Sequence, residues 1–279
     1  ATGLTDSYDY SAVFSEFSLQ SKLDYGKAFL FADVRFRGGT QFNEVYSTVE
    51  MKELYAGLRT SKLEIFLGEQ IVSWGRTDGF NPTNNITPNN YFFLSATPDD
   101  QKLPNFMLQM RYKITPQVSW DIIGIPFYKP SVYRYNLFEL GQNVSFDSGT
   151  IPENNFENSS LASRVNVELS ALGFSLSWFK GYDPFYGFEI SSIDFTTGQP
   201  VITNSPSFYS KNSIGFDIEI PISSWIIRGE VAGNFTKDFK ENMSIPNPNL
   251  AYVAAIEHSF FGLHTILQYI ANYNFEFER

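Results

Sequence analysis

The side chains best suited to acid–base chemistry are two histidines, His258 and His264, which are the only histidines in the chain. A hydrolase would hold such a histidine between a nucleophile and an acidic partner. The residues that flank these two form no such pattern, and cysteine, the alternative nucleophile, is absent from the sequence. We therefore predict that the protein is not an enzyme, that it has no catalytic residue, and that both histidines occupy wall or interfacial positions.

Metal and cofactor chemistry has little support in the sequence. Asp99 and Asp100 could supply oxygen ligands to a divalent cation, although an adjacent acidic pair more often only solvates a turn. The chain carries no P-loop, dinucleotide fingerprint, EF-hand or zinc-ligand spacing, so we expect neither a metal nor a cofactor. The net charge of -10 also argues against nucleic acid as a partner, because nucleic-acid binding needs a basic surface.

Most charged residues recur at alternate positions of apolar segments. In 104–114, for example, Leu108 and Met110 point one way while Gln109 and Arg111 point the other. A dry core could not hold many charges without a severe desolvation cost, whereas a water-filled barrel can. The residues that alternation assigns to a pore lining are Asp33, Arg35, Arg37, Glu53, Arg59, Glu64, Arg111, Lys113, Arg164, Glu168, Asp217, Glu219, Arg228 and Glu230.

Two interpretations of these charges remain open. Arg59, Arg111 and Lys113 fall near one end of two strands, and Asp217 and Glu219 fall near the same end of a distant strand. Basic and acidic walls that faced each other would create a transverse field across a pore. Alternatively, each charge pairs with a neighbouring strand and only maintains the shape of the wall.

The composition leads to the same class of membrane protein. Aromatic residues make up 17% of the chain and charged residues 18%, which is unusual for a soluble acidic domain. No uninterrupted apolar run reaches the roughly 18 residues that a membrane-spanning helix needs. A β-barrel reconciles these two facts, because only alternate residues of each strand face lipid.

About twelve strands can be recognised, and the connections between them alternate between short and long. Short periplasmic turns and long external loops are the rule in outer-membrane barrels, whereas a soluble all-β sandwich, the alternative, has no reason to sort its loops. The predicted strands are 9–20, 26–37, 47–60, 62–74, 104–114, 117–128, 159–171, 172–183, 207–220, 223–236, 248–260 and 262–278. The predicted long connections are 38–46, 75–103, 129–158, 184–206 and 237–247.

The predicted fold is thus one all-β domain over residues 1–279, a transmembrane antiparallel up-and-down β-barrel. With twelve strands and periplasmic short turns, both chain ends fall on the external side, whereas a complete single-chain barrel normally has both in the periplasm. We therefore expect the chain to be part of a larger barrel of 14 or more strands, unless the strand count is wrong by one.

Aromatic side chains gather near the short turns. Rings of this kind prefer the headgroup zone of a membrane, and barrels carry them in girdles. The alternative is that they are ordinary core aromatics of a soluble fold. The predicted membrane-interface residues are Tyr25, Trp120, Trp225, Phe260 and Phe261.

One strand end carries a specific pattern, which runs from Gly68 through Gln70 to Trp74 and Gly75. With the Asp-, Asn- and Pro-rich loop that follows, this segment resembles porin-like bacterial outer-membrane proteins that share a G-x-Q-x-x-x-W-G strand end. The resemblance covers roughly residues 64–103. It implies an outer-membrane channel and implies no catalytic residue.

The loop 75–103 is the longest polar connection that follows this pattern, and its prolines and aromatics predict an ordered structure. We expect it to fold into the barrel as a constriction, with an external cap as the alternative. Glu69 would face lipid by simple alternation, so a β-bulge at Gly68 is predicted to turn it inward. The predicted constriction residues are Trp74, Arg76, Asp78 and Phe80.

The function that best unites these features is a porin-like channel for the passive diffusion of small polar solutes. A structural or scaffold barrel in a larger complex is a second hypothesis, and an outer-membrane hydrolase is a third. The predicted location is a bacterial-type outer membrane, with its lipids and small polar solutes as partners. A homo-oligomer or partner subunits are compatible with the sequence, which requires neither.

Overall fold

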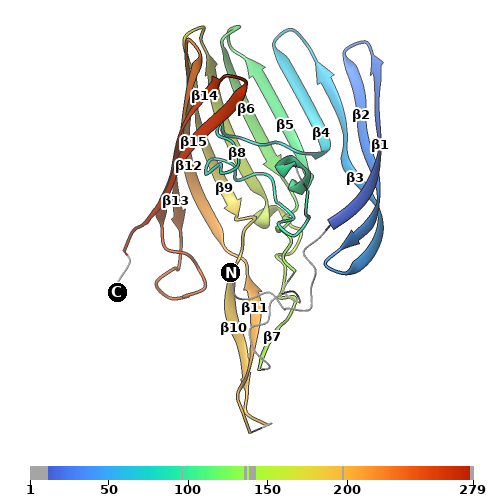
Figure 1. The fold of residues 1–279 in the computed structure, drawn as a ribbon, viewed down its shortest axis with the longest axis vertical. Coiled ribbons are helices and arrows are strands. Elements are labelled where there is room, and N and C mark those ends of the chain that lie inside the picture. Colours follow the sequence, from blue (N-terminus) through green and yellow to red (C-terminus); the bar gives the residue numbers. More distant parts are fainter. Residues whose placement is uncertain (1–11, 96, 135–136, 138–142, 197, 277–279) are drawn as a thin grey trace.

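A computed structural model describes residues 12–95, 97–134, 137, 143–196 and 198–276 of the chain. Twelve strands form one antiparallel sheet that curves around a central space, and each strand pairs with the next along the sheet (Figure 1). These strands are β1 (Ala12–Tyr25), β2 (Ala28–Gln41), β3 (Glu44–Arg59), β4 (Leu63–Gln70), β5 (Asn105–Lys113), β6 (Val118–Ile125), β8 (Ser160–Glu168), β9 (Gly173–Tyr182), β12 (Ser210–Ile222), β13 (Trp225–Thr236), β14 (Asn249–Phe260) and β15 (Leu263–Asn274).

The sheet reverses the usual distribution of polar and apolar side chains. On β9, Leu176 is 57% exposed, whereas Ser175 and Ser177 on the opposite face are buried. On the neighbouring β12, Ile214 is exposed and Asp217 is fully buried. Such a pattern suits a sheet whose outer face meets hydrocarbon. The prediction of a barrel-like sheet of about twelve strands is therefore confirmed.

One predicted long connection, 38–46, is wrong. Strand β2 continues to Gln41 and strand β3 begins at Glu44, so two residues, Phe42 and Asn43, join them. Both of these residues have positive φ. Two successive residues in this conformation make the tight turn that matches the twist of a β-hairpin. The ring of Phe42 is buried and lies 6.4 Å from that of Phe92, centroid to centroid, so tertiary packing favours a turn conformation that Phe rarely adopts.

A second, three-stranded sheet was not predicted. It consists of β10 (Gly187–Asp194), β11 (Val201–Ser207) and β7 (Val144–Phe146), in the order β10-β11-β7. These strands lie within two connections expected to be irregular, and β7 pairs with β11 in parallel over only three residues. The small sheet extends away from the main sheet on the side of the long loops (Figure 1).

The predicted bulge is also in a different place. Pairing of β4 with both neighbours continues in register through Gly68, so Glu69 stays on the outer face opposite Leu54 and Phe106. The irregularity lies in β3, where the register with β2 shifts by one residue at Lys52. Glu69 is accommodated at the end of its strand, where its carboxylate lies 3.9 Å from the Lys129 ammonium.

The two outer strands of the sheet, β1 and β15, have no pairing with each other among the described residues. Both begin or end on the side of the long loops (Figure 1). The first predicted strand starts at residue 9 and the last runs to 278, so their extreme residues lie outside the described part. Within the described ranges, the helical turns η1 (Pro98–Gln101) and η3 (Phe156–Asn158) are short, and no helix has the length and apolarity to cross a membrane.

Candidate functional site: a segment across the concave face

The segment 71–104 lies on the concave face of the main sheet, and we call it the inner segment (Figure 1). Trp74 anchors its first part, because it is only 2% exposed and packs with Ile86 against inward side chains of four strands. At its end, the Asn105 amide donates to the carbonyl of Ile86 over 3.1 Å. The inward side chains that complete this cluster are Met107, Ile123, Ile125, Ala162 and Phe179.

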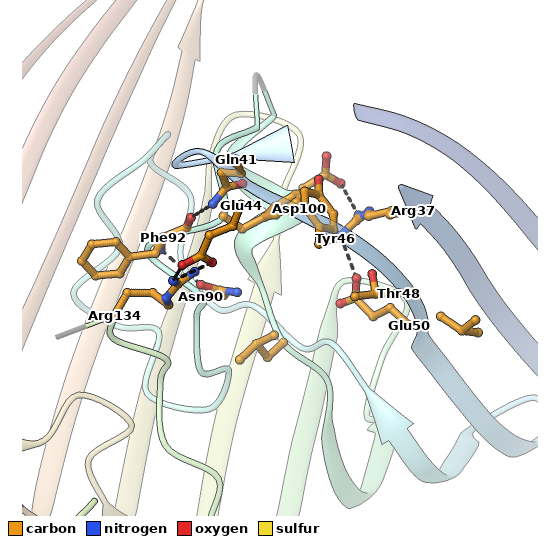
Figure 2. Close-up of a pocket in the computed structure, with 13 residues that line it drawn as sticks. Arg37, Gln41, Glu44, Tyr46, Thr48, Glu50, Asn90, Phe92, Asp100 and Arg134 are labelled. Carbon is orange, nitrogen blue, oxygen red and sulfur yellow. Dashed lines mark hydrogen bonds and ion pairs between the residues drawn. The ribbon is translucent and has the colours of Figure 1, made fainter. Parts of the chain in front are cut away.

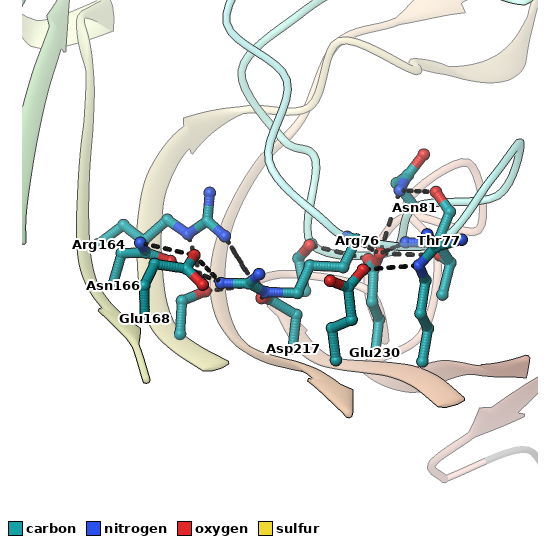
Figure 3. A network of polar contacts seen from close by, with 12 residues as sticks. Arg76, Thr77, Asn81, Arg164, Asn166, Glu168, Asp217 and Glu230 are labelled. Atoms are coloured by element: carbon teal, nitrogen blue, oxygen red, sulfur yellow. Dashed lines mark hydrogen bonds and ion pairs between the residues drawn. The ribbon is translucent and has the colours of Figure 1, made fainter. Parts of the chain in front are cut away.

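An arginine of the inner segment lies among carboxylates of the far wall (Figure 3). Arg76 Nε donates to Asp217 Oδ1 over 2.6 Å, and Nη2 donates to Glu168 Oε1 over 2.6 Å. Arg164 also contacts Asp217, at 3.2 Å, and Ser175 donates to it. Burial opposes ionisation of Arg76, but its bonds to Glu168 and Asp217 raise its pKa, so the guanidinium stays charged.

Glu230, on β13, accepts hydrogen bonds from several residues between Arg76 and Thr83, the part of the inner segment that we call its first limb (Figure 3). Its Oε1 accepts from the backbone amides of Arg76 and Thr77, over 2.5 and 2.6 Å, and from the Thr77 hydroxyl over 2.8 Å. The Asn81 amide donates to the same oxygen over 3.1 Å, and the Thr83 hydroxyl donates to Oε2 over 2.9 Å. A buried carboxylate with this many donors fixes the position of a loop.

The approach of Glu230 depends on Gly75. Its φ is +113°, which favours glycine, and a Cβ built there would lie 2.7 Å from both Glu230 carboxylate oxygens and 2.6 Å from Asn81 Nδ2. The neighbouring Gly79 has φ +85° but would place its Cβ in open space. The W-G pair of the strand-end pattern therefore has a physical reason, since Trp74 anchors the segment and Gly75 admits the carboxylate.

The last part of the inner segment, which carries Ser95, Asp100 and Lys102, is attached to the opposite wall, on β2 and β3. We call this part the returning limb. Asp100 accepts from Arg35 over 2.8 Å and from the Ser95 hydroxyl over 2.7 Å. The buried ammonium of Lys52 donates to the carbonyls of Asp100 and Lys102, over 2.8 and 2.6 Å. The β3 bulge thus provides the residue that holds this limb. Burial opposes ionisation of Asp100, but the bonds from Ser95 and Arg35 lower its pKa.

The two acidic residues proposed as cation ligands are engaged otherwise. Asp99 lies 2.8 Å from the Lys102 ammonium, and Asp100 pairs with Arg35. Among the described residues, no group of three or more His, Cys, Asp or Glu side chains is arranged to hold a metal ion.

Charges nearer the short turns pair with adjacent strands. Arg111 makes two bonds of 2.7 and 2.8 Å to Asp121, and Lys113 lies 2.8 Å from Glu64. Arg228 likewise donates to Glu219 over 2.7 Å. The structure therefore favours local pairing over uncompensated basic and acidic walls. A transverse field that depends on unpaired charge has no support from these contacts.

The remaining predicted lining residues fall on the same concave face. Glu53 accepts from the Ile71 amide over 3.1 Å, and Asp33 accepts from Gln20 over 2.9 Å. The guanidinium of Arg59 lies 4.6 Å from the ring centroid of Phe29. Strand alternation with these contacts puts all the charged residues predicted for the lining on the side that carries the inner segment.

The predicted constriction residues divide between attachment to the sheet and exposure to the central space. Trp74 is buried against the sheet and Arg76 forms an ion pair with Asp217, whereas Asp78 and Phe80 are exposed. The carboxylate of Asp78 lies 3.1 Å from Arg228. The sequence did not single out Thr77, Thr83 or Lys52, because their roles come from partners on distant strands; a polar loop next to an alternating wall was the only available signal.

Both histidines lie near the short turn between β14 and β15. The ring centroid of His258 is 4.0 Å from those of Trp225 and Phe260. His264 contacts Ser259 and Glu257, each at 3.3 Å, but its side chain is more than half exposed. His264 thus lies between a hydroxyl and a carboxylate, but its exposure leaves it without the low-dielectric surroundings that strengthen transition-state stabilisation in acyl transfer.

The five predicted interface aromatics are all exposed and lie in or beside short turns. Trp120 Nε1 donates to the Ser163 hydroxyl over 2.9 Å, so its polar atom is satisfied while the ring remains accessible. This combination suits the headgroup zone. Their contact with lipid remains a prediction.

Comparisons with known proteins inform the fold. No family model matches the sequence, and no curated protein matches it. Among solved structures, OmpF of Salmonella typhi in complex with daunomycin has a TM-score of 0.53 and 10% identity, covering 93% of this chain and 71% of OmpF. OmpT of Vibrio cholerae has a TM-score of 0.51 and 10% identity, covering 91% of this chain and 68% of OmpT. The chain therefore has the fold of bacterial outer-membrane β-barrels, and this fold indicates the outer membrane as its location.

Proposed function

We propose that the protein is a porin-like channel through which small polar solutes diffuse passively across the outer membrane. The observation that carries this proposal is the inner segment, which spans from Asp217 and Glu230 on one wall to Arg35 and Lys52 on the other. A loop tethered to both walls narrows the space inside the curved sheet without needing a partner. The fold and the resemblance of residues 64–103 to porin-like proteins also support a channel.

In this proposal the inner segment sets which solutes pass. Buried carboxylates hold the first limb of this segment through short hydrogen bonds, so the first limb has a fixed position and shape. The charged side chains of the concave face form hydrogen bonds with polar solutes and disfavour the passage of apolar ones. The residues at the narrowing would be Arg76, Asp78 and Phe80, with Trp74 as their anchor in the wall.

The scaffold hypothesis is the second candidate, because the cluster around Trp74 fills part of the concave face with tightly packed apolar side chains. In a scaffold barrel the remaining space would be occupied by a partner subunit. Such a protein would be folded and membrane-inserted but would not conduct ions.

Planar-bilayer recording of the folded protein separates these hypotheses. A channel predicts stepwise conductance that rises when Arg76 and Glu230 are both replaced by alanine, because the first limb then loses its wall contacts. Replacement of both Arg59 and Glu64, an ion pair that lies apart from that limb, by alanine is the matched control, because it also removes one positive and one negative charge. A correctly folded protein that insulates, or that conducts only after a co-purifying subunit is removed, would contradict the channel and favour the scaffold.

A further inference from the structure

A cavity of about 300 Å³ lies between the start of the inner segment and the concave face of β3, β4 and β5. Residues 71–73 cover one side of it, and it extends toward the short turns as far as Arg59 and Arg111. Cavities of this size hold small organic molecules. A solute that crossed the barrel would therefore pass this cavity on the side of the inner segment that faces the short turns.

Two glutamines that line this cavity have amide atoms without partners. Gln70, the glutamine of the strand-end pattern, is 3% exposed, and its Nε2 donates to the carbonyls of Gly68 and Met107 over 3.3 and 3.0 Å. Its Oε1 accepts no hydrogen bond from a described residue. Gln109 is 6% exposed, and its side chain forms no hydrogen bond with a described residue. The free atoms of both amides are accessible from the cavity, and leaving such groups unsatisfied is costly.

A peptide group matches these two amides. A carboxamide side chain and a peptide group each combine a carbonyl acceptor with an N–H donor. The Oε1 atom of Gln70 can therefore accept from a peptide N–H, and the Gln109 amide can donate to a peptide carbonyl. The Tyr55 hydroxyl also lines the cavity without a partner among the described residues, and it can either donate or accept.

The two ends of the cavity carry charges of opposite sign that are not fully compensated. Glu53, at the end next to the inner segment, accepts from the Ile71 amide but forms no ion pair with a described residue. At the other end, the Arg59 side chain is 49% exposed, and its Nε lies 4.0 Å from Glu64. The Glu64 carboxylate is bound more closely by Lys113, over 2.8 Å. A ligand with a cationic end and an anionic end would complement both Glu53 and Arg59.

These charges disfavour the other classes of solute. Arg111 is neutralised by its two bonds to Asp121, so the lining holds one incompletely compensated charge of each sign. A simple anion would leave Glu53 without a counter-charge, and a simple cation would leave Arg59 without one. A neutral solute would leave both charges as they are.

A larger cavity, of about 440 Å³, lies between the β2–β3 hairpin and the returning limb (Figure 2). Both of its guanidinium groups are paired with carboxylates, Arg37 with Glu50 over 2.7 Å and Arg134 with Glu44 over 2.8 Å. A charged ligand would have to break these pairs. The smaller cavity is therefore the stronger candidate for a binding site.

The spacing of the charges sets the length of the ligand. Glu53 and Arg59 are six residues apart on β3, which corresponds to about 20 Å of strand. Their own side chains extend over part of that span. An extended peptide of three residues covers roughly 10 Å, which is a suitable length for the remaining part.

We propose that this cavity binds a short zwitterionic peptide of about three residues as a subsite of the channel, an inference that rests on the proposed function and names one class of its solutes. The peptide ammonium lies against Glu53 and the peptide carboxylate against Arg59. Between these ends, the peptide groups form hydrogen bonds with Gln70 and Gln109.

The test compares three tripeptides that differ only at their ends. Triglycine carries both charges, N-acetyl-triglycine lacks the cationic end, and triglycinamide lacks the anionic end. Binding to the complete folded protein is measured by equilibrium dialysis in detergent, and block of the ion current is measured in planar bilayers. We expect triglycine to bind about three- to tenfold more tightly than either capped peptide, because each cap removes one charged contact.

Replacement Glu53→Gln tests where the ammonium lies. Glutamine keeps an oxygen that can accept from the Ile71 amide but has no charge. The preference for triglycine over N-acetyl-triglycine should therefore disappear, while the preference over triglycinamide should persist. Glu189→Gln, the same change at an exposed position of β10 in the small sheet, is the matched control and should retain both preferences.

The outcomes separate this inference from the proposed function. Selective binding of triglycine without any conductance would overturn the channel while preserving the subsite. Conductance without a preference for triglycine over both capped peptides would overturn the subsite while preserving the channel. A Glu53→Gln protein that still preferred the free ammonium would show that the peptide lies elsewhere.

Discussion

At the scale of single residues, carboxylates on the concave face differ in what they stabilise. Asp217 is fully buried between the guanidinium groups of Arg76 and Arg164, whereas Glu168, which also contacts Arg76, is 54% exposed. Removing one partner of a buried ion pair leaves an uncompensated charge, whereas exposed pairs are screened by water. The same arginine therefore has one partner that matters for stability and one that contributes little.

We predict that Asp217→Asn lowers the free energy of unfolding by about 3 kcal/mol or more, because Arg76 and Arg164 lose their shared counter-charge. Glu168→Gln should cost about 0–1 kcal/mol. Urea unfolding of the protein in lipid vesicles, followed by tryptophan fluorescence, measures both. Equal losses for the two variants would mean that Asp217 is hydrated in the membrane.

Gly75 and Gly79 form a second pair of matched positions, since both have positive φ and only Gly75 is enclosed. Gly79→Ala should cost about 1–2 kcal/mol, from backbone strain alone. Gly75→Ala should cost more and should also displace Glu230, so amide hydrogen exchange at Arg76 and Thr77 should accelerate in that variant only. Unchanged protection of these amides in Gly75→Ala would contradict the proposed fit of the carboxylate against the glycine.

At the scale of elements, the inner segment is held by two different devices. Its first limb is held by the carboxylate of Glu230, on β13, whereas its return is held by Lys52, which the β3 bulge adds to the concave face. A bulge inserts one residue and so changes which side chains face inward beyond it. The sheet irregularity and the position of the loop are thus parts of one arrangement.

The return also has a predictable response to acid. The pKa of Asp100 is lowered in the folded protein, so its contribution is complete above the pKa of an unfolded aspartate, about 3.9, and is lost as the pH falls through the lowered value. The stability difference between the unchanged protein and Asp100→Asn should therefore stay constant from about pH 8 to 5 and shrink only below about pH 4. Unfolding experiments across that range measure it, and a decline near neutral pH would be inconsistent with the Arg35 and Ser95 contacts.

At the scale of the whole molecule, the sheet is apolar outside and polar inside, which is the reverse of a soluble protein. Trp178 shares the outer face with Leu176 and Ile214, while Trp74, in the inner segment, is buried against the concave face. A membrane that surrounds the sheet would contact the first tryptophan and not the second.

Single-tryptophan proteins test this orientation. In vesicles with brominated acyl chains, fluorescence of a protein that retains only Trp178 should be strongly quenched, and fluorescence of one that retains only Trp74 should be nearly unaffected, because bromine quenches by contact. Both should be equally accessible to quencher after unfolding in urea, which serves as the control. Similar quenching of the two folded proteins would exclude the proposed orientation of the sheet in the membrane.

Local pattern was sufficient for the strands of the main sheet. Alternation in segments such as 104–114 reports which face each side chain occupies, because the period of two is a property of the extended backbone itself. Side chains such as Arg111 and Asp217 could thus be assigned to the concave face. The β2–β3 turn at Phe42 and Asn43 could not be predicted, because it depends on packing against Phe92, far along the chain.

The amino-acid sequence by itself determined an all-β barrel-like sheet, the inward and outward faces of its strands, and a long ordered loop after Gly75, because these follow from local alternation and local backbone chemistry. Only the tertiary structure decided that Glu230 binds Arg76 and Thr77, that Lys52 forms the bulge, and that charges pair with neighbouring strands. These contacts join residues from different strands and loops, and their energies depend on distances that exist only after the sheet has curved around the inner segment.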